Sequence, residues 1–306
     1  MRTINTLFKP AWWLPGPHLQ TLWTSLVRRS IKLNARLERL ELSDGDFLDL
    51  SWVGENKGPI VCVLHGLNGS VESSYAQGML QAISKRGWRA VLMHFRGCSG
   101  VPNRLPRSYH AGETGDLATL IQTLMHREPG IPIAAIGYSL GGNVLLKWLG
   151  ETGVHNPLQA AIAVSVPFDL AKTADRLKRG FSKIYQWKLL RELNRKHHSK
   201  HTTFWAFDHY VTAPVHGFES AQHYYKLSSS RQYLGAIKTP TLILHARNDP
   251  FTTERSLPNM NEVSDQVVLE FTEKGGHVGF IAGRYPWSPV YWLEDRIVNY
   301  LEAVFN

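Results

Sequence analysis

Apolar runs alternate with amphipathic stretches over the first half of this chain. The apolar runs cover residues 59–66, 88–95, 131–139 and 158–167. Between them lie stretches with helical periodicity, at residues 73–87, 112–128 and 140–153. A strand that is apolar along its whole length is buried on both faces, as in parallel sheets that helices cover on each side. The pattern predicts the α/β class, with a mostly parallel central sheet and helices on both faces.

A different kind of sequence interrupts this alternation between about residues 168 and 237. It is basic, aromatic and histidine-rich, and its character is helical. The alternation resumes with apolar runs at 239–247 and 266–272, and a final helix is expected from about 290 to 304. The interruption therefore predicts a helical cap inserted between two strands of the sheet.

The start of the chain predicts an arm followed by a hairpin. Residues 37–42 and 47–53 flank Ser43-Asp44-Gly45-Asp46, an arrangement typical of two antiparallel strands joined by an Asp-Gly turn. We expect an N-terminal arm over about 1–36. With 306 residues, the chain is predicted to form a single domain, 1–306, that carries the cap as an insertion.

Composition excludes a disordered chain and locates the charge. Hydrophobic residues make up 43% and charged residues 19%, which is enough apolar sequence for a sizeable core. The net charge is +9, and residues 172–200 hold ten Lys or Arg against two acidic residues. Two cysteines, Cys62 and Cys98, lie near apolar runs and indicate a reduced, cytoplasmic setting. No signal peptide or membrane-spanning helix is expected.

A candidate nucleophile lies in Gly137-Tyr138-Ser139-Leu140-Gly141. This G-x-S-x-G sequence directly follows a predicted strand and directly precedes a predicted helix, which is the context of a nucleophile elbow. A residue on such a sharp turn has a strained backbone, and the flanking glycines let the strand and helix pass closely. Ser139 is therefore expected to stand exposed above the sheet.

A base and an orienting acid follow the serine in the order that this architecture uses. Asp249 comes after the predicted strand 239–247, and His277 comes after the predicted strand 266–272. Open α/β sheets place their ligands at the carboxyl ends of strands. Ser139, Asp249 and His277 are therefore the predicted catalytic triad, with Asp169 in reserve as the acid.

An oxyanion needs two preorganised N–H donors beside the serine. The residue after the nucleophile, Leu140, supplies one backbone N–H, and the loop after the run 59–64 supplies the other. In that loop, His65-Gly66 permits a turn that presents the N–H of Leu67. Leu67 and Leu140 are therefore the predicted oxyanion-hole donors.

Several short motifs extend the pattern beyond the triad. They are Gly16–Thr21, His65–Leu67, Phe95–Gly100, Gly112–Leu117, Gly137–Gly142, Tyr224–Tyr225, Asn248–Pro250 and Gly275–His277. With these motifs the chain resembles the α/β-hydrolase fold over nearly its whole length. More narrowly, it resembles the YheT-like bacterial hydrolases, relatives of the mammalian and yeast α/β-hydrolase-domain esterases of lipid metabolism. The resemblance implies the triad derived above and hydrolysis of carboxylic esters.

One position departs from the family's pattern. His94 precedes Phe95-Arg96-Gly97 where the resemblance leads us to expect Asn, and this change concerns the loop beside the oxyanion hole. Arg96 follows a strand end, where it can pair with Asp116 and hold the wall of the site. We expect both of these residues to act as scaffold.

These observations predict a serine esterase for short- to medium-chain or lipid-like esters, acting through an acyl-enzyme on Ser139. Two alternatives remain: an acyltransferase that uses an alcohol acceptor, and a non-catalytic lipid-binding protein. No cofactor and no nucleic acid is expected, because the usual motifs for binding them are missing from the sequence. No metal is expected either, because His197, His198 and His201 lie among cations that repel a metal ion. Residues 172–200 predict peripheral contact with an anionic membrane surface. The oligomeric state stays open.

Overall fold

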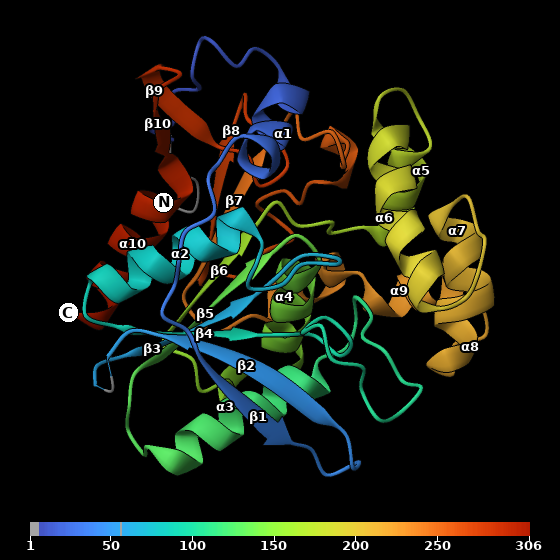
Figure 1. The fold of residues 1–306 in the computed structure, drawn as a ribbon, viewed down its shortest axis with the longest axis horizontal. Coiled ribbons are helices and arrows are strands. Elements are labelled where there is room, and N and C mark those ends of the chain that lie inside the picture. The colour runs from blue at the N-terminus through green and yellow to red at the C-terminus, as the bar shows by residue number, and fades with distance from the viewer. Residues whose placement is uncertain (1–5, 56) are drawn as a thin grey trace.

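Eight strands form one central sheet in the computed structural model, which describes residues 6–55 and 57–306 (Figure 1). Their order across the sheet is β1-β2-β4-β3-β5-β6-β7-β8. The strands are β1 Arg36–Glu41, β2 Phe47–Val53, β3 Ile60–Leu64, β4 Arg89–Met93, β5 Ile133–Tyr138, β6 Ala160–Val164, β7 Thr241–Ala246 and β8 Val267–Thr272. Strand β2 pairs antiparallel with β1 and β4, and all other neighbours are parallel. The predicted fold class and the opening hairpin are confirmed.

The two faces of the sheet carry two separate cores. In β3, Ile60, Cys62 and Leu64 belong to one core, and Val61 and Val63 belong to the other. Successive side chains of a strand point to opposite faces, so a strand buried between two cores must be apolar at every position. This is the physical reason for the continuous apolar runs.

Helices cover both faces of the sheet. The helix α2 Ser74–Lys85 packs with α10 Trp292–Phe305 on one face, and α3 Gly115–Arg127 lies with α4 Leu140–Thr152 on the other (Figure 1). A further helix, α1 Pro17–Leu26, precedes β1 and packs near α2. Short 3₁₀ helices complete the connections: η1 Gly153–His155, η3 Ser230–Ala236 and η4 Glu254–Ser256.

The chain between β6 and β7 forms a group of helices, which stands apart from the sheet layers (Figure 1). We call residues 165–240 the helical insert. It contains α5 Leu170–Leu177, α6 Ser182–Lys196, α7 Phe204–Phe207, α8 Ala213–Val215 and α9 Ala221–Ser228, with a π-helical turn at Asp208–Thr212. Its inner side chains meet the carboxyl ends of the strands around a common cavity.

A small hairpin near the C-terminus was absent from the sequence prediction. Strands β9 Ile281–Tyr285 and β10 Ser288–Tyr291 pair antiparallel and form a separate two-stranded sheet. The expected final helix is present as α10 Trp292–Phe305, and it starts two residues later than expected because β10 uses residues up to Tyr291. The pairing partner of β10 decides this boundary, and helical periodicity alone does not reveal it.

Two further observations bear on compartment and membrane. Cys62 and Cys98 are both buried and unlinked. Among the helices that the structure describes, none combines the length and the apolar character that crossing a bilayer requires.

Candidate active site

Ser139 lies on the sharp turn between β5 and α4. Its φ is 51° and its ψ is −116°, a left-handed conformation that non-glycine residues rarely adopt. A side chain at Gly137 would place its Cβ 2.5 Å from the carbonyl oxygen of Gly141, and one at Gly141 would lie 2.5 Å from that of His65. Only glycine at both positions permits this close approach, which explains the local sequence.

His277 and Asp249 meet the serine at the edge where the parallel strands end. The Nε2 atom of His277 lies 2.9 Å from Ser139 Oγ, and its Nδ1 lies 2.9 Å from Asp249 Oδ2. The structure thus brings together the three side chains that the sequence singled out. Asp169, the reserve acid, caps α5 instead and accepts a hydrogen bond from the N–H of Lys172.

The environment of Asp249 keeps its carboxylate charged. Burial raises the pKa of this carboxyl, but the adjacent His277 and the N–H of Phe251 outweigh burial, so that the pKa lies below its usual value. A carboxylate that accepts hydrogen bonds from two directions is held in one orientation. Asp249 can therefore orient the imidazole and fix the proton on Nδ1.

Phe251 is a neighbour of the histidine that the sequence reasoning missed. Its ring stacks on the imidazole of His277 with a centroid distance of 3.8 Å and an interplanar angle of 2°. The ring also lines the cavity beside Ser139. It therefore limits the imidazole to the plane in which both nitrogens reach their partners. The signal available in the sequence was its position two residues after Asp249.

The helix α1 clamps the loop that carries His277. The N–H of His277 donates to Thr21 Oγ1 at 2.8 Å, and the side chain of Gln20 makes two hydrogen bonds to the backbone of Ile281. At Gly279, an added Cβ would lie 2.0 Å from the carbonyl oxygen of Gln20. Within the arm, Gly16–Thr21 thus includes the residues that hold the histidine loop, a role that the sequence reasoning did not assign.

A second support for the same loop comes from Ser165, which directly follows β6. The N–H of Val278 donates to Ser165 Oγ at 3.0 Å, and both residues have positive φ angles, of 59° and 52°. Such conformations cost about 1–3 kcal/mol each and persist where the surrounding contacts determine them. Together with α1, Ser165 defines the backbone on both sides of His277.

Two tyrosines, Tyr109, which is buried, and Tyr75, which is partly buried, hold the loop that contains Leu67. The N–H of Gly66 donates to Tyr75 Oη, and the N–H of Asn68 donates to Tyr109 Oη, each at 2.9 Å. The N–H of Leu67 lies between these two anchored groups. Leu67 and Leu140 both line the cavity that contains Ser139, as two oxyanion donors must.

His65 also holds this loop, as a neutral side chain. Its Nε2 accepts the N–H of Phe95 at 3.1 Å, and its Nδ1 lies 2.7 Å from the carbonyl oxygen of Gly66. Burial lowers the pKa of His65 to about 3. His94, the residue that departs from the family's pattern, is buried nearby and bonds to Ser51 Oγ at 2.9 Å. This hydrogen bond ties the end of β4 to β2.

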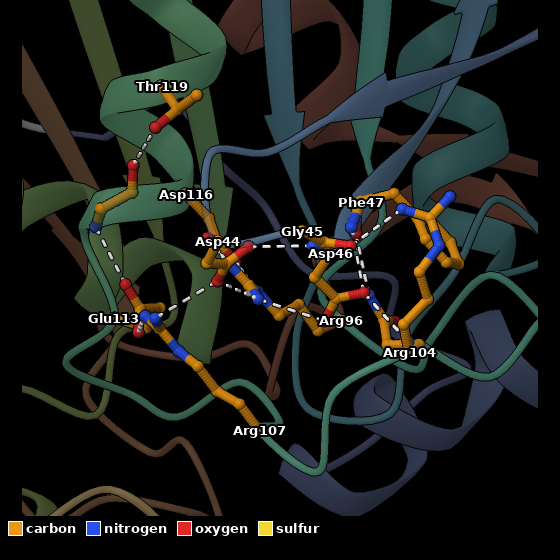
Figure 2. A network of polar contacts seen from close by, with 12 residues as sticks. Asp44, Gly45, Asp46, Phe47, Arg96, Arg104, Arg107, Glu113, Asp116 and Thr119 are labelled. Atoms are coloured by element: carbon orange, nitrogen blue, oxygen red, sulfur yellow. Dashed lines mark hydrogen bonds and ion pairs between the residues drawn. The ribbon is translucent and has the colours of Figure 1, made fainter.

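Arg96 is the centre of a buried charge network whose residues do not line the cavity at Ser139 (Figure 2). Its guanidinium makes two hydrogen bonds with Asp116, at 2.7 and 2.8 Å, which confirms the predicted pair. It also pairs with Asp44 at 2.7 Å and with Asp46 at 3.2 Å. The network joins the β1–β2 turn, the loop after β4 and the start of α3, and so acts as scaffold.

The cavity at Ser139 is mostly apolar and has a volume of about 120 Å³. Its polar walls include a buried carboxyl, Asp208, whose two oxygens accept the hydroxyls of Thr212 at 2.6 Å and Tyr225 at 2.5 Å. Most of its lining comes from the helical insert: Leu170, Ala174, Leu177, Leu189, Leu193, Phe204, Phe207, Val211, Val215, Tyr224 and Tyr225. The cavity suits an apolar chain that extends from the serine.

Some aromatic residues of the helical insert line this cavity, and others lie on the outer surface. Phe204, Phe207, Tyr224 and Tyr225 line the cavity. Phe181, Trp187 and Tyr210 are exposed. Among the described residues there is no cluster of three or more His, Cys, Asp or Glu side chains that fits a metal ion.

The fold and the arrangement of these side chains define a hydrolase class, and comparison with known proteins agrees. Residues 59–218 match the model of the alpha/beta hydrolase fold, and the chain belongs to this family. It is 42% identical to the protein named "Putative esterase YheT" of Escherichia coli, over 94% of this chain and 91% of that protein. The resemblance to YheT-like hydrolases is thereby confirmed.

A more distant relative and a solved structure are also similar to this chain. The phospholipase ABHD3 of Mus musculus is 27% identical over 96% of this chain and 77% of its own length. The crystal structure of the Pyrococcus furiosus esterase Pf2001 superposes with a TM-score of 0.63 at 17% identity, covering 98% of this chain and 100% of that one. The structural likeness supports the fold.

Proposed function

We propose that this protein is a serine hydrolase that cleaves carboxylic esters through an acyl-enzyme on Ser139. The observation that carries the proposal is the hydrogen-bonded series from Ser139 Oγ through His277 to Asp249, which opens into an apolar cavity. Each member of the series has one role in acyl transfer. The names of the relatives, an esterase and a phospholipase, support the same chemistry.

The geometry accounts for each proton. His277 Nε2 accepts the proton of Ser139 as Oγ attacks the ester carbonyl, and Asp249 stabilises the resulting imidazolium. The backbone N–H groups of Leu67 and Leu140 hold the oxyanion. His277 then donates the proton to the departing alcohol. A water molecule, deprotonated by His277, attacks the acyl-enzyme, the acid leaves and Ser139 regains its proton.

The substrate class follows from the lining of the cavity. Because its walls are aliphatic and aromatic, the acyl part of the ester is apolar, of short to medium length or lipid-like. The helical insert, whose central part is residues 168–237, acts as the cap over the serine, and the whole chain works as a single hydrolase domain.

Covalent labelling tests the nucleophile directly. A fluorophosphonate probe is expected to label the wild-type protein and not Ser139→Ala, while circular dichroism shows that both are folded. Hydrolysis of nitrophenyl esters is expected to fall roughly 10⁴- to 10⁶-fold in this variant. Turnover that persists in Ser139→Ala at the wild-type rate contradicts the proposal. A series of acyl lengths then identifies the chain that the cavity prefers.

A further inference from the structure

The helix α6 exposes apolar side chains on the surface of the helical insert. Phe181, Ile184 and Trp187 are 44%, 53% and 61% exposed, although large apolar residues are usually buried. Phe181 is the N-cap of α6, where its ring also contacts His18, and Ile184 and Trp187 follow at every third position. The three therefore lie along one side of the helix together with Lys188, Arg191 and Arg195. We call these six residues the outer face of α6.

Positive charge surrounds these apolar groups. The two acidic residues of the segment 172–200 already have partners, since Asp175 pairs with Lys178 and Glu192 with Lys196. On the outer face, Lys188 and Arg195 form no ion pair with any described residue. The guanidinium of Arg191 lies 5.6 Å from the ring of Trp187. The outer face therefore presents cations that no acidic side chain neutralises.

The opposite side of the same helix forms the wall of the candidate active site. Leu189 and Leu193 line the cavity, and the carbonyl oxygen of Leu189 accepts a hydrogen bond from Asn68 Nδ2 at 3.1 Å. Asn68 directly follows Leu67, the proposed oxyanion donor. One helix thus separates the cavity from the outer face, and whatever binds the outer face lies one helix away from the cavity.

The chemistry of this surface selects its partner. A second copy of the chain would place two strongly positive faces against each other, which electrostatic repulsion disfavours. An acidic protein would match the charge but gives no role to three exposed apolar side chains at helical spacing. A helix with Trp, Phe and Ile among Lys and Arg fits the interface of an anionic lipid bilayer, where apolar groups enter the acyl boundary and cations meet the headgroups.

We infer that the outer face of α6 docks this protein on anionic lipid bilayers, with α6 lying in the interface above the substrate cavity. This inference is independent of the proposed ester hydrolysis, because the docking residues do not line the cavity. Docking brings the cavity next to the lipid phase in which esters with long apolar parts dissolve. A hydrolase that acts on such esters then meets its substrate at the surface.

Sedimentation with vesicles tests the docking. Wild-type protein is expected to sediment with vesicles that contain phosphatidylglycerol and to remain in solution with phosphatidylcholine alone, and added salt reduces binding. Lys188→Gln and Arg191→Gln should each lower the partition coefficient roughly fivefold, the equivalent of about 1 kcal/mol per cation. Trp187→Ser should lower it as well, because it removes an apolar anchor.

A matched control uses an exposed tryptophan elsewhere. Trp287 is 80% exposed on the β9–β10 turn, far across the molecule from α6 (Figure 1), and Trp287→Ser should bind like the wild type. Ser139→Ala should also bind unchanged, so failure of docking and failure of the proposed hydrolysis are distinguishable. Hydrolysis of a water-soluble ester should be unchanged in Trp187→Ser, which shows that this variant is folded.

Three results overturn the inference. One is absence of binding to the anionic vesicles, and a second is binding that is equal in Trp187→Ser and Trp287→Ser. The third is binding of the protein to an acidic polypeptide, if Lys188→Gln and Arg191→Gln abolish this binding and Trp187→Ser does not change it. That result would identify an acidic protein as the partner.

Discussion

At the scale of single residues, the site depends on backbone conformations that are unfavourable in isolation. Ser139, Ser165 and Val278 all have positive φ angles, and each lies within one residue of a side chain in the triad or bonds to the loop that carries it. Such strain costs about 1–3 kcal/mol per residue and must be offset by packing elsewhere. The hydrogen bonds that the hydroxyls of Thr21 and Ser165 accept from the N–H groups of His277 and Val278 are part of that compensation.

Thr21 is expected to act through the position of His277. Its hydroxyl accepts the N–H of His277 and donates to the carbonyl oxygen of Pro17. Thr21→Val keeps the shape but leaves that N–H unpaired, which costs about 1–3 kcal/mol. We expect kcat to fall roughly tenfold or more with little change in KM, while Thr21→Ser keeps wild-type kinetics. A purely structural role predicts instead a lower melting temperature with unchanged kcat in the valine variant.

At the scale of secondary-structure elements, the π-helical turn Asp208–Thr212 carries an unusual group. Asp208 is 8% exposed, and burial raises its pKa to about 6 even though the hydroxyls of Thr212 and Tyr225 stabilise the charged form. An unfolded aspartate titrates near 3.9. Between about pH 4 and pH 6 the folded protein therefore binds more protons than the unfolded chain does, and its stability falls as the pH rises.

Replacing this carboxyl is expected to remove that pH dependence. Above about pH 6 the charged carboxylate costs on the order of 3 kcal/mol, so Asp208→Asn should gain stability relative to the wild type as the pH rises from 4 to 6. Urea unfolding at several pH values measures the difference. Asp175→Asn is the control, because Asp175 is a surface carboxyl whose pKa Lys178 lowers, and its removal brings no such gain. Parallel stability curves for wild type and Asp208→Asn contradict this prediction.

At the scale of the whole molecule, the network of Arg96 connects parts of the chain that are distant in sequence. Arg96 is 4% exposed and faces Asp44, Asp46 and Asp116 (Figure 2). Removing the cation leaves the buried carboxylate of Asp116 without its ion-pair partner and takes one partner from buried Asp46, a loss that typically costs about 3–5 kcal/mol. The β1–β2 turn and the start of α3 lose their common link to the loop after β4.

Arg96→Ala is accordingly expected to lower the free energy of unfolding by about 3–5 kcal/mol. Arg104→Ala provides a matched comparison, because Arg104 makes an ion pair with Glu41 at the surface of the same network. Exposed ion pairs contribute up to about 1 kcal/mol, so this second variant should remain close to the wild type. Chemical denaturation of both proteins checks the pair. Equal losses in the two variants would show that burial of the network does not govern its contribution.

The sequence by itself determined the class of the fold and singled out the side chains of the candidate site. Apolar runs predicted the strands because a buried strand needs apolar residues on both faces, and the glycines around Ser139 predicted the sharp turn because only they allow the close approach. The side chains of Asp249 and His277 were found from their order and from their places at strand ends. Apolar runs, glycine positions and the order of residues are all properties of the sequence, so they can be recognised without any tertiary structure.

Only the tertiary structure decided how that site is held. Thr21 is 256 residues from His277 along the chain, and their hydrogen bond arises because α1 packs against the histidine loop. The stacking of Phe251, the pairing of β10 with β9 and the place of Asp208 in the cavity likewise depend on contacts between distant segments. Periodicity indicates the secondary structure that each segment can form by itself, and motifs indicate the chemistry that its side chains can perform. Which segments meet depends on the packing of the whole chain, because that packing selects among many compatible partners.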